Sequence, residues 1–533
     1  MCLKQHEVVL INPSVSFDEA QTGYHQNVKQ YGLLAFLGNL GVEVRLLDAQ
    51  LHRLTPDEIL SDLKKRPASV VVVDLFYRTL PFVEELFKKI EASSDLDNVF
   101  YVLTGLAATL STNKILFDIP RVNAIALGEN EYTLLELIEA IKHKRYWKDI
   151  QSLAYMSEEG EPVTNPARDF IKDLDILPFA VRDNLKYLAQ VESVEISSSR
   201  GCDSSCSFCV VRPFNSQKGF SYWRPRSAEN VVEEIKFIID QYNCFNFQFV
   251  DDCFFGNGKN GYERAHTFAE NILKLDKQIS FSFFCRSNHV ESSLFKKLKQ
   301  AGLHTVNIGF ESASQRILDK LNKRSTVEQS EEAILILKKL GIRIVPSFIL
   351  FEPTITLNEI RDTLIFMIKH GFQNSISPSV VIPFEKTLLG NNLIKTGLVD
   401  FTKYTLFPYL NDIKYVYHEV ALLRMKWLEW IDLINRNYNN LHSAISKINH
   451  YFLESFIVDN KAEWNCLQQL VAKLNEMEIQ YILSLIEELS SENSWQNSHN
   501  YLKPNVSCML DRISIEISDI KADYPEILES LGI

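Results

Sequence analysis

Residues 194–209 read VEISSSRGCDSSCSFC and hold three of the chain's nine cysteines. Cys202, Cys206 and Cys209 follow a short apolar strand pattern with the spacing C-x3-C-x2-C. Three thiolates on one loop can bind three irons of a 4Fe-4S cube and leave the fourth iron without a protein ligand. Gly201, directly before the first cysteine, lets the backbone turn closely past such a cube. The spacing therefore predicts a 4Fe-4S cluster on this loop.

Two other interpretations of this spacing stay open. A structural zinc site needs a fourth ligand, and such sites usually show paired C-x2-C halves. The other candidate ligands, Cys244, Cys253 and Cys285, are single and lie in or beside apolar strand patterns, where cysteines are typical inert core residues. Three unrelated cysteines on a polar loop are the second alternative. The iron–sulfur interpretation accounts best for the close spacing.

The sequence before the cysteine loop alternates between strand and helix patterns. Short β-branched or aromatic runs at 8–11, 42–47, 70–73, 99–103 and 122–126 are separated by helical patterns at 28–40, 56–65, 81–90 and 130–141. Such alternation predicts an open, doubly wound parallel sheet with right-handed crossovers. Sheets of this kind bind ligands at the carboxyl ends of their strands.

The sequence after the loop repeats the alternation and then changes. Strand patterns at 194–196, 245–250, 279–284, 305–309, 342–351 and 377–382 alternate with helical patterns at 228–241, 262–275, 291–301, 327–340 and 357–370. Six β-α units predict a partial α/β barrel. Long amphipathic patterns follow at 417–435, 441–456 and 461–489. We therefore expect a domain at 1–142, a linker at 143–190, a barrel at 191–390 and a helical domain at 391–533.

Composition and charge exclude several classes of protein. The 533 residues are 46% hydrophobic, so the chain is not a mainly disordered protein. Lys and Arg number 56 against 68 Asp and Glu, a formal net charge of −12, which makes nucleic acid an unexpected partner. No apolar run approaches the roughly 18 residues needed to span a bilayer. The N-terminus enters a strand pattern without a signal-peptide core, so we expect a cytoplasmic protein.

Three further segments join the cysteine loop in a resemblance to the radical SAM superfamily. They are WRPRSAENVVEEI at 223–235, FVDDCFF at 249–255 and IGFESAS at 308–314. The resemblance implies that the open iron binds S-adenosylmethionine, whose reductive cleavage gives a 5′-deoxyadenosyl radical. It also implies cofactor contacts from Phe208, Asp251, Asp252, Arg286, Glu311 and Ser312. The alternative is that the carboxylates cap helices or turns, that Arg286 forms an ordinary ion pair and that Phe208 is a core aromatic.

The N-terminal part resembles the cobalamin-binding domain of cobalamin-dependent radical SAM enzymes. TGLAAT at 104–109 and LGENEYT at 127–133 match two of that domain's loops. The resemblance implies cobalamin contacts at Thr104, Gly105, Leu106, Gly128 and Glu129. The chain has no D-x-H-x-x-G motif, so we expect no histidine on the cobalt. The alternative is a degenerate domain that braces the barrel or contacts the substrate.

Together the resemblances imply an α/β fold with a doubly wound cobalamin-binding-like domain and a partial (β/α)6 barrel, and the amphipathic patterns after residue 390 predict a C-terminal helical domain outside the resemblance. The implied function is methylation of an unactivated carbon of a peptide or small natural product, through a 5′-deoxyadenosyl radical and methylcobalamin. The implied cofactors are a 4Fe-4S cluster, S-adenosylmethionine and cobalamin, with flavodoxin or ferredoxin as electron donor. A radical SAM enzyme without methyl transfer, or a non-catalytic iron–sulfur interaction protein, is the alternative. No catalytic side chain is identified from the sequence.

Overall fold

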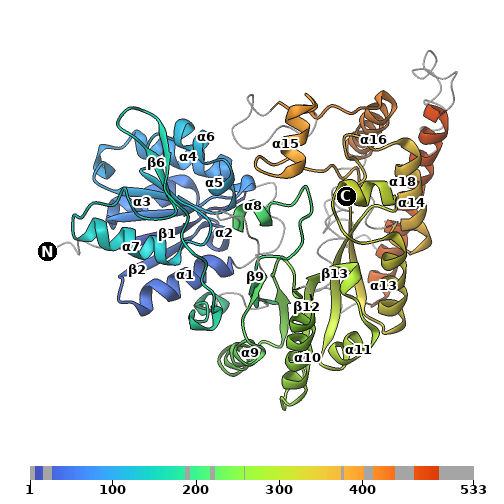
Figure 1. The fold of residues 1–533 in the computed structure, drawn as a ribbon, viewed down its shortest axis with the longest axis horizontal. Helices are drawn as coiled ribbons and strands as arrows, with labels where there is room; N and C mark the ends of the chain where they lie inside the picture. Colours follow the sequence, from blue (N-terminus) through green and yellow to red (C-terminus); the bar gives the residue numbers. More distant parts are fainter. Residues whose placement is uncertain are drawn as a thin grey trace.

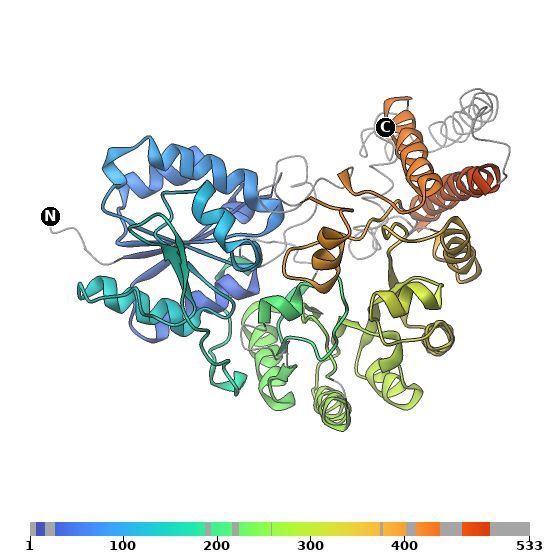
Figure 2. The same ribbon diagram turned by 45° about the horizontal axis from the view of Figure 1, so that its top comes forward.

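A computed structural model describes residues 7–15, 27–186, 193–215, 223–256, 258–373, 377–400, 412–437 and 461–490. Two sheets with their covering helices lie side by side, and the last helices flank the second sheet on the side away from the first (Figures 1 and 2). The predicted helix at 441–456 lies outside the described residues.

The first sheet has the strand order β2-β1-β3-β4-β5-β6-β7, and its first five strands are parallel. Helices cover both faces, as the separate apolar clusters on the two sides show. This arrangement confirms the predicted doubly wound sheet, whose strand order reverses between β1 and β3. The elements are β1 (Val8–Asn12), β2 (Val44–Asp48), β3 (Val70–Asp74), β4 (Phe100–Thr104), β5 (Ala124–Ala126), α1 (Val28–Asn39), α3 (Pro56–Lys65), α4 (Leu80–Glu91) and α7 (Glu131–Lys142).

Part of the segment expected as a linker belongs to this first sheet. Strands β6 (Leu153–Met156) and β7 (Pro162–Thr164) extend it antiparallel beyond β5. Their runs are too short for a clear alternating pattern, which is why the sequence predicted a linker there. Further along, Arg182 forms a buried ion pair of 2.9 Å with Glu234 and so attaches the connecting chain to the barrel.

The second sheet is parallel, in the order β14-β13-β12-β11-β8. The predicted sixth strand was wrong in extent, because only a bridge between Phe351 and Val380 forms there. Pro378 and Pro383 flank the bridge and cannot donate to a strand ladder. The elements are β8 (Val194–Ile196), β11 (Asn246–Phe249), β12 (Ser280–Cys285), β13 (Leu303–Glu311), β14 (Arg343–Phe348), α9 (Ala228–Tyr242), α10 (Lys259–Leu273), α11 (Ser292–Gln300), α13 (Val327–Lys339) and α14 (Leu357–Lys369).

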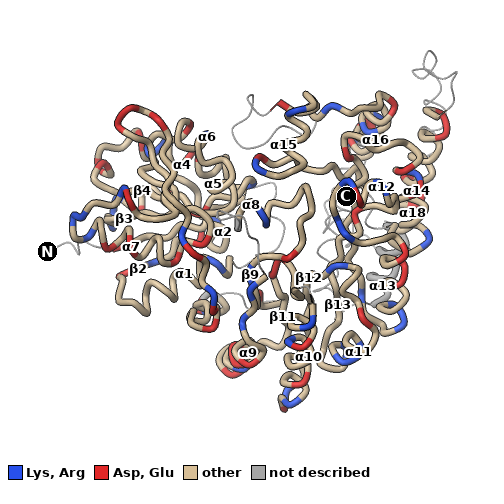
Figure 3. The backbone as a smooth tube through the Cα atoms, in the orientation of Figure 1, with Lys and Arg blue, Asp and Glu red and all other residues tan. Residues whose placement is uncertain are grey.

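The described C-terminal helices, α16 (His418–Asn437) and α18 (Lys461–Ser490), share the hydrophobic core of the barrel. The ring of Trp427 is fully buried, and its centroid lies 5.9 Å from that of the Phe351 ring. Its Nε1–H donates to Glu478 Oε1 at 2.5 Å. These helices therefore complete the barrel's packing instead of forming a core of their own. Among the described residues, no helix is long and apolar enough to cross a membrane. Acidic and basic residues are interspersed over both sheets (Figure 3).

Candidate active site

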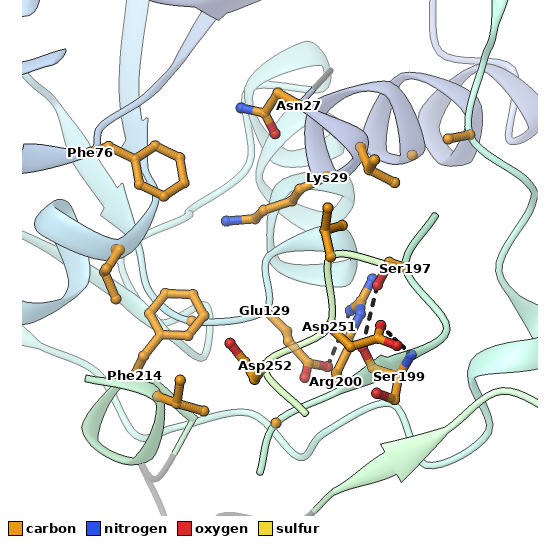
Figure 4. Close-up of a pocket in the computed structure, with 18 of the residues that line it drawn as sticks. Asn27, Lys29, Phe76, Glu129, Ser197, Ser199, Arg200, Phe214, Asp251 and Asp252 are labelled. Carbon is orange, nitrogen blue, oxygen red and sulfur yellow. Dashed lines mark hydrogen bonds and ion pairs between the residues drawn. The ribbon is translucent and has the colours of Figure 1, made fainter. Parts of the chain in front are cut away.

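A cavity of about 840 Å³ lies between the carboxyl ends of the two sheets. The N-terminal domain lines it with Asn12, Lys29 and Gly128, and the barrel with Gly201 and Asp252. Most of the remaining wall is apolar and includes Phe76, Phe214 and Phe384. Lys29 extends into this space, with its amine 5.6 Å from the centre of the Phe214 ring (Figure 4). The cavity therefore joins the edges where both kinds of sheet bind ligands.

The cysteine loop lies at the barrel side of this cavity. Cys202, Cys206 and Cys209 are all partly exposed. Gly201 has φ +80°, which confirms the turn that the sequence predicts before the first thiol. The backbone amide of Ser204 donates to Cys202 Sγ at 3.5 Å, and Arg286 donates to Cys206 Sγ at 3.5 Å. Thiolates with such donors have the chemistry that an iron–sulfur cluster requires.

The cysteines outside the loop have different surroundings. Cys253 and Cys285 are buried, and burial raises the pKa of the Cys285 thiol. Within the described residues, no three His, Cys, Asp or Glu side chains converge as they would on a single metal ion. In a four-iron cube each loop thiolate binds a different iron, so the three sulfurs need not meet at one point.

The segment after β13 holds the cysteine loop in place. Asn322 donates to the carbonyl of Ser205 at 2.7 Å, and the amide of Ser207 donates to the carbonyl of Leu321 at 2.8 Å. Asn322 was not predicted as a support of the loop. A segment 117 residues further along the chain thus fixes the conformation of the cysteine loop.

The two predicted aspartates have different surroundings. Asp251 accepts hydrogen bonds from the amides of Ser198 and Ser199 at 2.7 and 2.9 Å, so it supports the turn that leads into the cysteine loop. Asp252 is exposed to the cavity. Removal from bulk water, followed by the charge of Asp251, raises the pKa of Asp252 to about 6. Of the pair, Asp252 is the carboxylate available to a ligand.

Glu311 ends strand β13 with φ +67° and forms a buried ion pair of 2.6 Å with Lys323. The carboxylate of Glu311 packs against Gly309. A Cβ at position 309 would lie only 2.2 Å from Glu311 Oε1. The G-x-E spacing thus has a steric reason: the glycine leaves room for the carboxylate of the glutamate.

Changing Gly309→Ala is expected to displace Glu311 without disturbing the cysteine loop. If Glu311 contacts S-adenosylmethionine, the loss of one charge-assisted hydrogen bond weakens binding by about ten- to hundredfold. Calorimetric titration of the cluster-containing protein with S-adenosylmethionine measures this, and the cluster absorbance should stay unchanged. Gly38→Ala is the control, since a Cβ there meets nothing within 4 Å. Unchanged affinity in Gly309→Ala would return Glu311 to a structural role.

The other three predicted contacts of the cofactor are already engaged within the protein. Arg286 is buried and donates to Cys206 and to the carbonyl of Lys323. The hydroxyl of Ser312 lies 3.2 Å from that of Thr363. Phe208 packs against the barrel core. Their contacts with S-adenosylmethionine remain predictions.

The carboxyl edge of the first sheet carries a network of polar side chains. Asn27 donates to Asp74 and to Asn12, both at 3.0 Å, and Thr104 donates to Asp74 at 3.1 Å. The amine of Lys29 lies 3.8 Å from the same Asp74 carboxylate. The network lies at the β1/β3 switch point. Lys29 and Asn27 were not predicted as site residues, because their positions on or beside a helix give no periodic signal.

The five residues predicted to contact cobalamin divide into two groups. Leu106, Gly128 and Glu129 line the cavity. Thr104 is fully buried behind it, and Gly105 packs against the backbone of β3, where a Cβ would lie 2.7 Å from the carbonyl oxygen of Leu75. Those two residues therefore shape the wall instead of facing the space.

Glu129 and Glu131 are bound by arginines of the barrel. Arg200 donates to Glu131 at 2.6 Å and lies 3.4 Å from Glu129, while Arg224 donates to Glu129 at 3.1 Å. Burial would raise the pKa of Glu131, but the adjacent Arg200 outweighs it, so the pKa of Glu131 is lowered. Neither arginine was predicted as a functional residue. Arg200 could have been noted for its place two residues before the first cysteine.

Comparisons with known proteins agree with this site. Residues 196–367 match the Radical SAM superfamily. An uncharacterized methyltransferase of Pyrococcus horikoshii is 30% identical over 412 residues, which cover 74% of this chain and 86% of the relative. The anaerobic magnesium-protoporphyrin IX monomethyl ester cyclase of Rubrivivax gelatinosus is 26% identical over 60% of this chain and 58% of its own length.

Two solved structures share the fold. The cobalamin-dependent S-adenosylmethionine radical enzyme OxsB, with aqua-cobalamin and S-adenosylmethionine bound, has a TM-score of 0.78 at 19% identity, over 98% of this chain and 81% of that one. The radical S-adenosylmethionine methyltransferase TsrM from Kitasatospora setae has a TM-score of 0.62 at 17% identity, over 74% of this chain and 75% of that one.

A cysteine loop at the edge of a partial barrel, facing a doubly wound sheet, defines a radical enzyme built on two ligand-binding edges. The chain belongs to the radical SAM superfamily, and its fold is that of the cobalamin-dependent members. The predicted family, fold class, 4Fe-4S cluster and S-adenosylmethionine are thereby confirmed. The three loop thiolates, with their hydrogen-bond donors, fit the cluster.

Proposed function

We propose that this chain is a cobalamin-dependent enzyme that methylates an unactivated carbon of a peptide or small natural-product substrate. The observation that carries the proposal is the cavity shared by the cysteine loop and the carboxyl edge of the doubly wound sheet. One space bounded by both edges can hold a methyl carrier and a radical source within reach of a single substrate.

The chain's own residues would bind, orient and exclude water. The loop cysteines would hold the cluster, and Asp252 and Glu311 would accept from the charged or hydroxyl groups of S-adenosylmethionine. Small and apolar residues such as Leu106 and Gly128 would allow a corrin to approach the first sheet. When bound, the cofactors supply the electron, the radical and the methyl group. The apolar walls would keep water away from the radical.

Two relatives named as methyltransferases support methyl transfer, and a relative named as a cyclase supports the alternative of a radical reaction without methyl transfer. Besides the methyltransferase of Pyrococcus horikoshii, a cytidylyl-2-hydroxyethylphosphonate methyltransferase of Streptomyces wedmorensis is 23% identical over 74% of this chain. The cyclase of Rubrivivax gelatinosus favours a radical reaction without methyl transfer. Incubation with reductant and S-adenosylmethionine separates the two. Formation of S-adenosylhomocysteine together with 5′-deoxyadenosine supports methyl transfer, and 5′-deoxyadenosine alone supports the alternative.

Cobalamin is expected to bind without a histidine on the cobalt. The described residues that line the cavity include no histidine, and His52 is exposed on the short helix α2 (Ala49–His52). His6 and His25 lie outside the described residues. The protein should retain hydroxocobalamin through gel filtration, and its cob(II)alamin state should lack nitrogen superhyperfine splitting in electron paramagnetic resonance.

The histidine variants test the two parts of this prediction separately. His25→Ala and His52→Ala should leave the resonance spectrum unchanged. A splitting that disappears in either variant would contradict the expected coordination. Failure of the wild-type protein to retain cobalamin would contradict the proposed function and leave a cobalamin-independent radical enzyme.

A further inference from the structure

Two carboxylates of the N-terminal domain meet two guanidinium groups of the barrel beside the cavity. We call these four residues, Glu129, Glu131, Arg200 and Arg224, the interdomain latch. Arg200 donates to Glu131 at 2.6 Å and approaches Glu129 at 3.4 Å, and Arg224 donates to Glu129 at 3.1 Å. Figure 4 shows Arg200 and Glu129 joined at the edge of the cavity.

The latch connects two loops that carry the proposed chemistry. Glu131 begins α7, directly after the Gly128 turn at the carboxyl end of β5. Arg200 ends strand β9 (Ser199–Arg200) and is followed at once by Gly201 and Cys202. The Arg200–Glu131 contact therefore lies within three positions of Gly128, which lines the cavity, and within two positions of Cys202.

The barrel side of the latch is rigidly supported. Strand β10 (Arg224–Pro225) pairs antiparallel with β9, and this pairing sets Arg224 opposite Arg200. Arg224 also donates to the carbonyl of Ile171 at 2.6 Å and lies over the Phe170 ring at 4.6 Å. Backbone pairing thus places both arginines, and the contacts with Ile171 and Phe170 hold the Arg224 guanidinium.

The burial of these charges indicates a role in geometry. The side chains of Glu131, Glu129 and Arg224 are 7%, 11% and 11% exposed, and that of Arg200 is 27% exposed. A buried ion pair adds little net stability because both charges lose their hydration, but it is costly to break and permits few arrangements. Carboxylate–arginine hydrogen bonds are also strongly directional. Such ion pairs therefore fix the distance between the two domains more narrowly than non-directional contacts between apolar surfaces do.

We propose that the interdomain latch sets the spacing between the N-terminal ligand edge and the cysteine loop, and that Glu129 and Glu131 are positioning residues. The inference rests on the proposed function, because the spacing matters only if a methyl group crosses the cavity. In that step the methyl–sulfur bond of S-adenosylmethionine would break, S-adenosylhomocysteine would leave with the electron pair of that bond, and bound cobalamin in its reduced state would supply the two electrons of the new bond to carbon. Reductive cleavage to 5′-deoxyadenosine takes place at the barrel alone.

The two reactions therefore provide an internal comparison. We would reconstitute full-length protein with iron, sulfide and hydroxocobalamin, add S-adenosylmethionine and titanium(III) citrate, and measure the initial rates of both products without substrate, within the single methylation that each bound cobalamin allows. In Glu131→Gln, the ratio of S-adenosylhomocysteine to 5′-deoxyadenosine should fall about tenfold or more, because a misplacement of about 1 Å is enough to slow a transfer strongly. Iron and cobalamin contents should stay at the wild-type level.

A matched control is a second ion pair between the N-terminal domain and the C-terminal part of the chain. Glu385 forms a 3.1 Å ion pair with Lys114, and its side chain is 23% exposed. Glu385→Gln also removes one interdomain charge, yet it should leave the product ratio unchanged. Glu129→Gln is a milder latch variant, because Arg200 keeps its contact with Glu131, and it serves if Glu131→Gln folds poorly.

Hydrogen–deuterium exchange gives a readout that needs no cofactor. Peptides covering 128–134 and 197–203 should exchange faster in Glu131→Gln and Glu129→Gln, and not in Glu385→Gln. An unchanged ratio with unchanged exchange would overturn the proposal, and so would an equal loss of both products, which indicates general damage. If wild-type protein binds no cobalamin, the proposed function fails, and the exchange of the two peptides still decides whether the latch fixes the domains.

Discussion

Replacing Cys202, Cys206 and Cys209 together by Ala is expected to remove about four irons per chain and to abolish 5′-deoxyadenosine formation. The three thiols are the partly exposed cysteines of one loop, and hydrogen-bond donors already face two of the sulfurs. Without a ligand on three of its irons a cube has no protein attachment. The expected loss of activity is complete, because the cluster delivers the electron that cleaves S-adenosylmethionine.

Iron and sulfide analysis, visible absorbance and chromatographic detection of 5′-deoxyadenosine on anaerobically reconstituted protein measure this effect. Cys244→Ser is the matched control, because Cys244 is a partly buried thiol whose contact is with the carbonyl of Tyr242. It should keep wild-type iron and activity. Retention of the iron in the triple variant would show that the cluster, or another metal, is bound elsewhere.

Gly105→Ala is expected to give the largest loss of stability among single substitutions in the N-terminal domain. Gly105 has φ +100° and ψ 179°, a conformation that only glycine adopts readily and that costs other residues about 1–3 kcal/mol. A Cβ there would also lie 2.7 Å from both Asp74 Oδ1 and the carbonyl oxygen of Leu75. Relieving such overlap in a packed core costs about 1–3 kcal/mol more.

The combined cost is a large part of the roughly 5–15 kcal/mol that stabilises a typical domain. Urea unfolding followed by circular dichroism should show the loss, together with poor retention of hydroxocobalamin. Gly41→Ala is the control, because Gly41 has φ +79° but a Cβ there meets nothing within 4 Å. It should cost about 1 kcal/mol through its backbone conformation alone. Equal stability of the two variants would show that the close approach at Gly105 is not constrained.

Several helices and strands are encoded locally, and the sequence predicted them closely. The capping box of Thr55 and Glu58 places the start of α3 at Pro56, as expected. The four valines of β3 are fully buried, as a strand covered on both faces requires. Where local signals were weak, the prediction was wrong: β6 and β7 lay within the expected linker, and the sixth barrel strand was reduced to a bridge.

The site shows the same division between local and distant information. The cysteine spacing by itself predicted the cluster loop, because all three expected ligands lie within eight consecutive residues. The sequence did not distinguish the roles of Asp251 and Asp252. Only the fold shows that the backbone amides of Ser198 and Ser199 donate hydrogen bonds to Asp251. Likewise, the match at 127–133 pointed to Glu129 as a cobalamin contact, whereas the folded chain pairs it with Arg200 and Arg224.

The sequence by itself therefore determined the family, the parallel strands of the two sheets and the expected cluster ligands, because spacing and periodicity are properties of short segments. Only the tertiary structure decided which charged side chains face the cavity and which join the two domains. Glu131 and Arg200 are 69 residues apart, and their 2.6 Å contact exists only when two sheets present their carboxyl edges to each other. A charge on a strand end has many possible partners, and the packing of distant elements selects one.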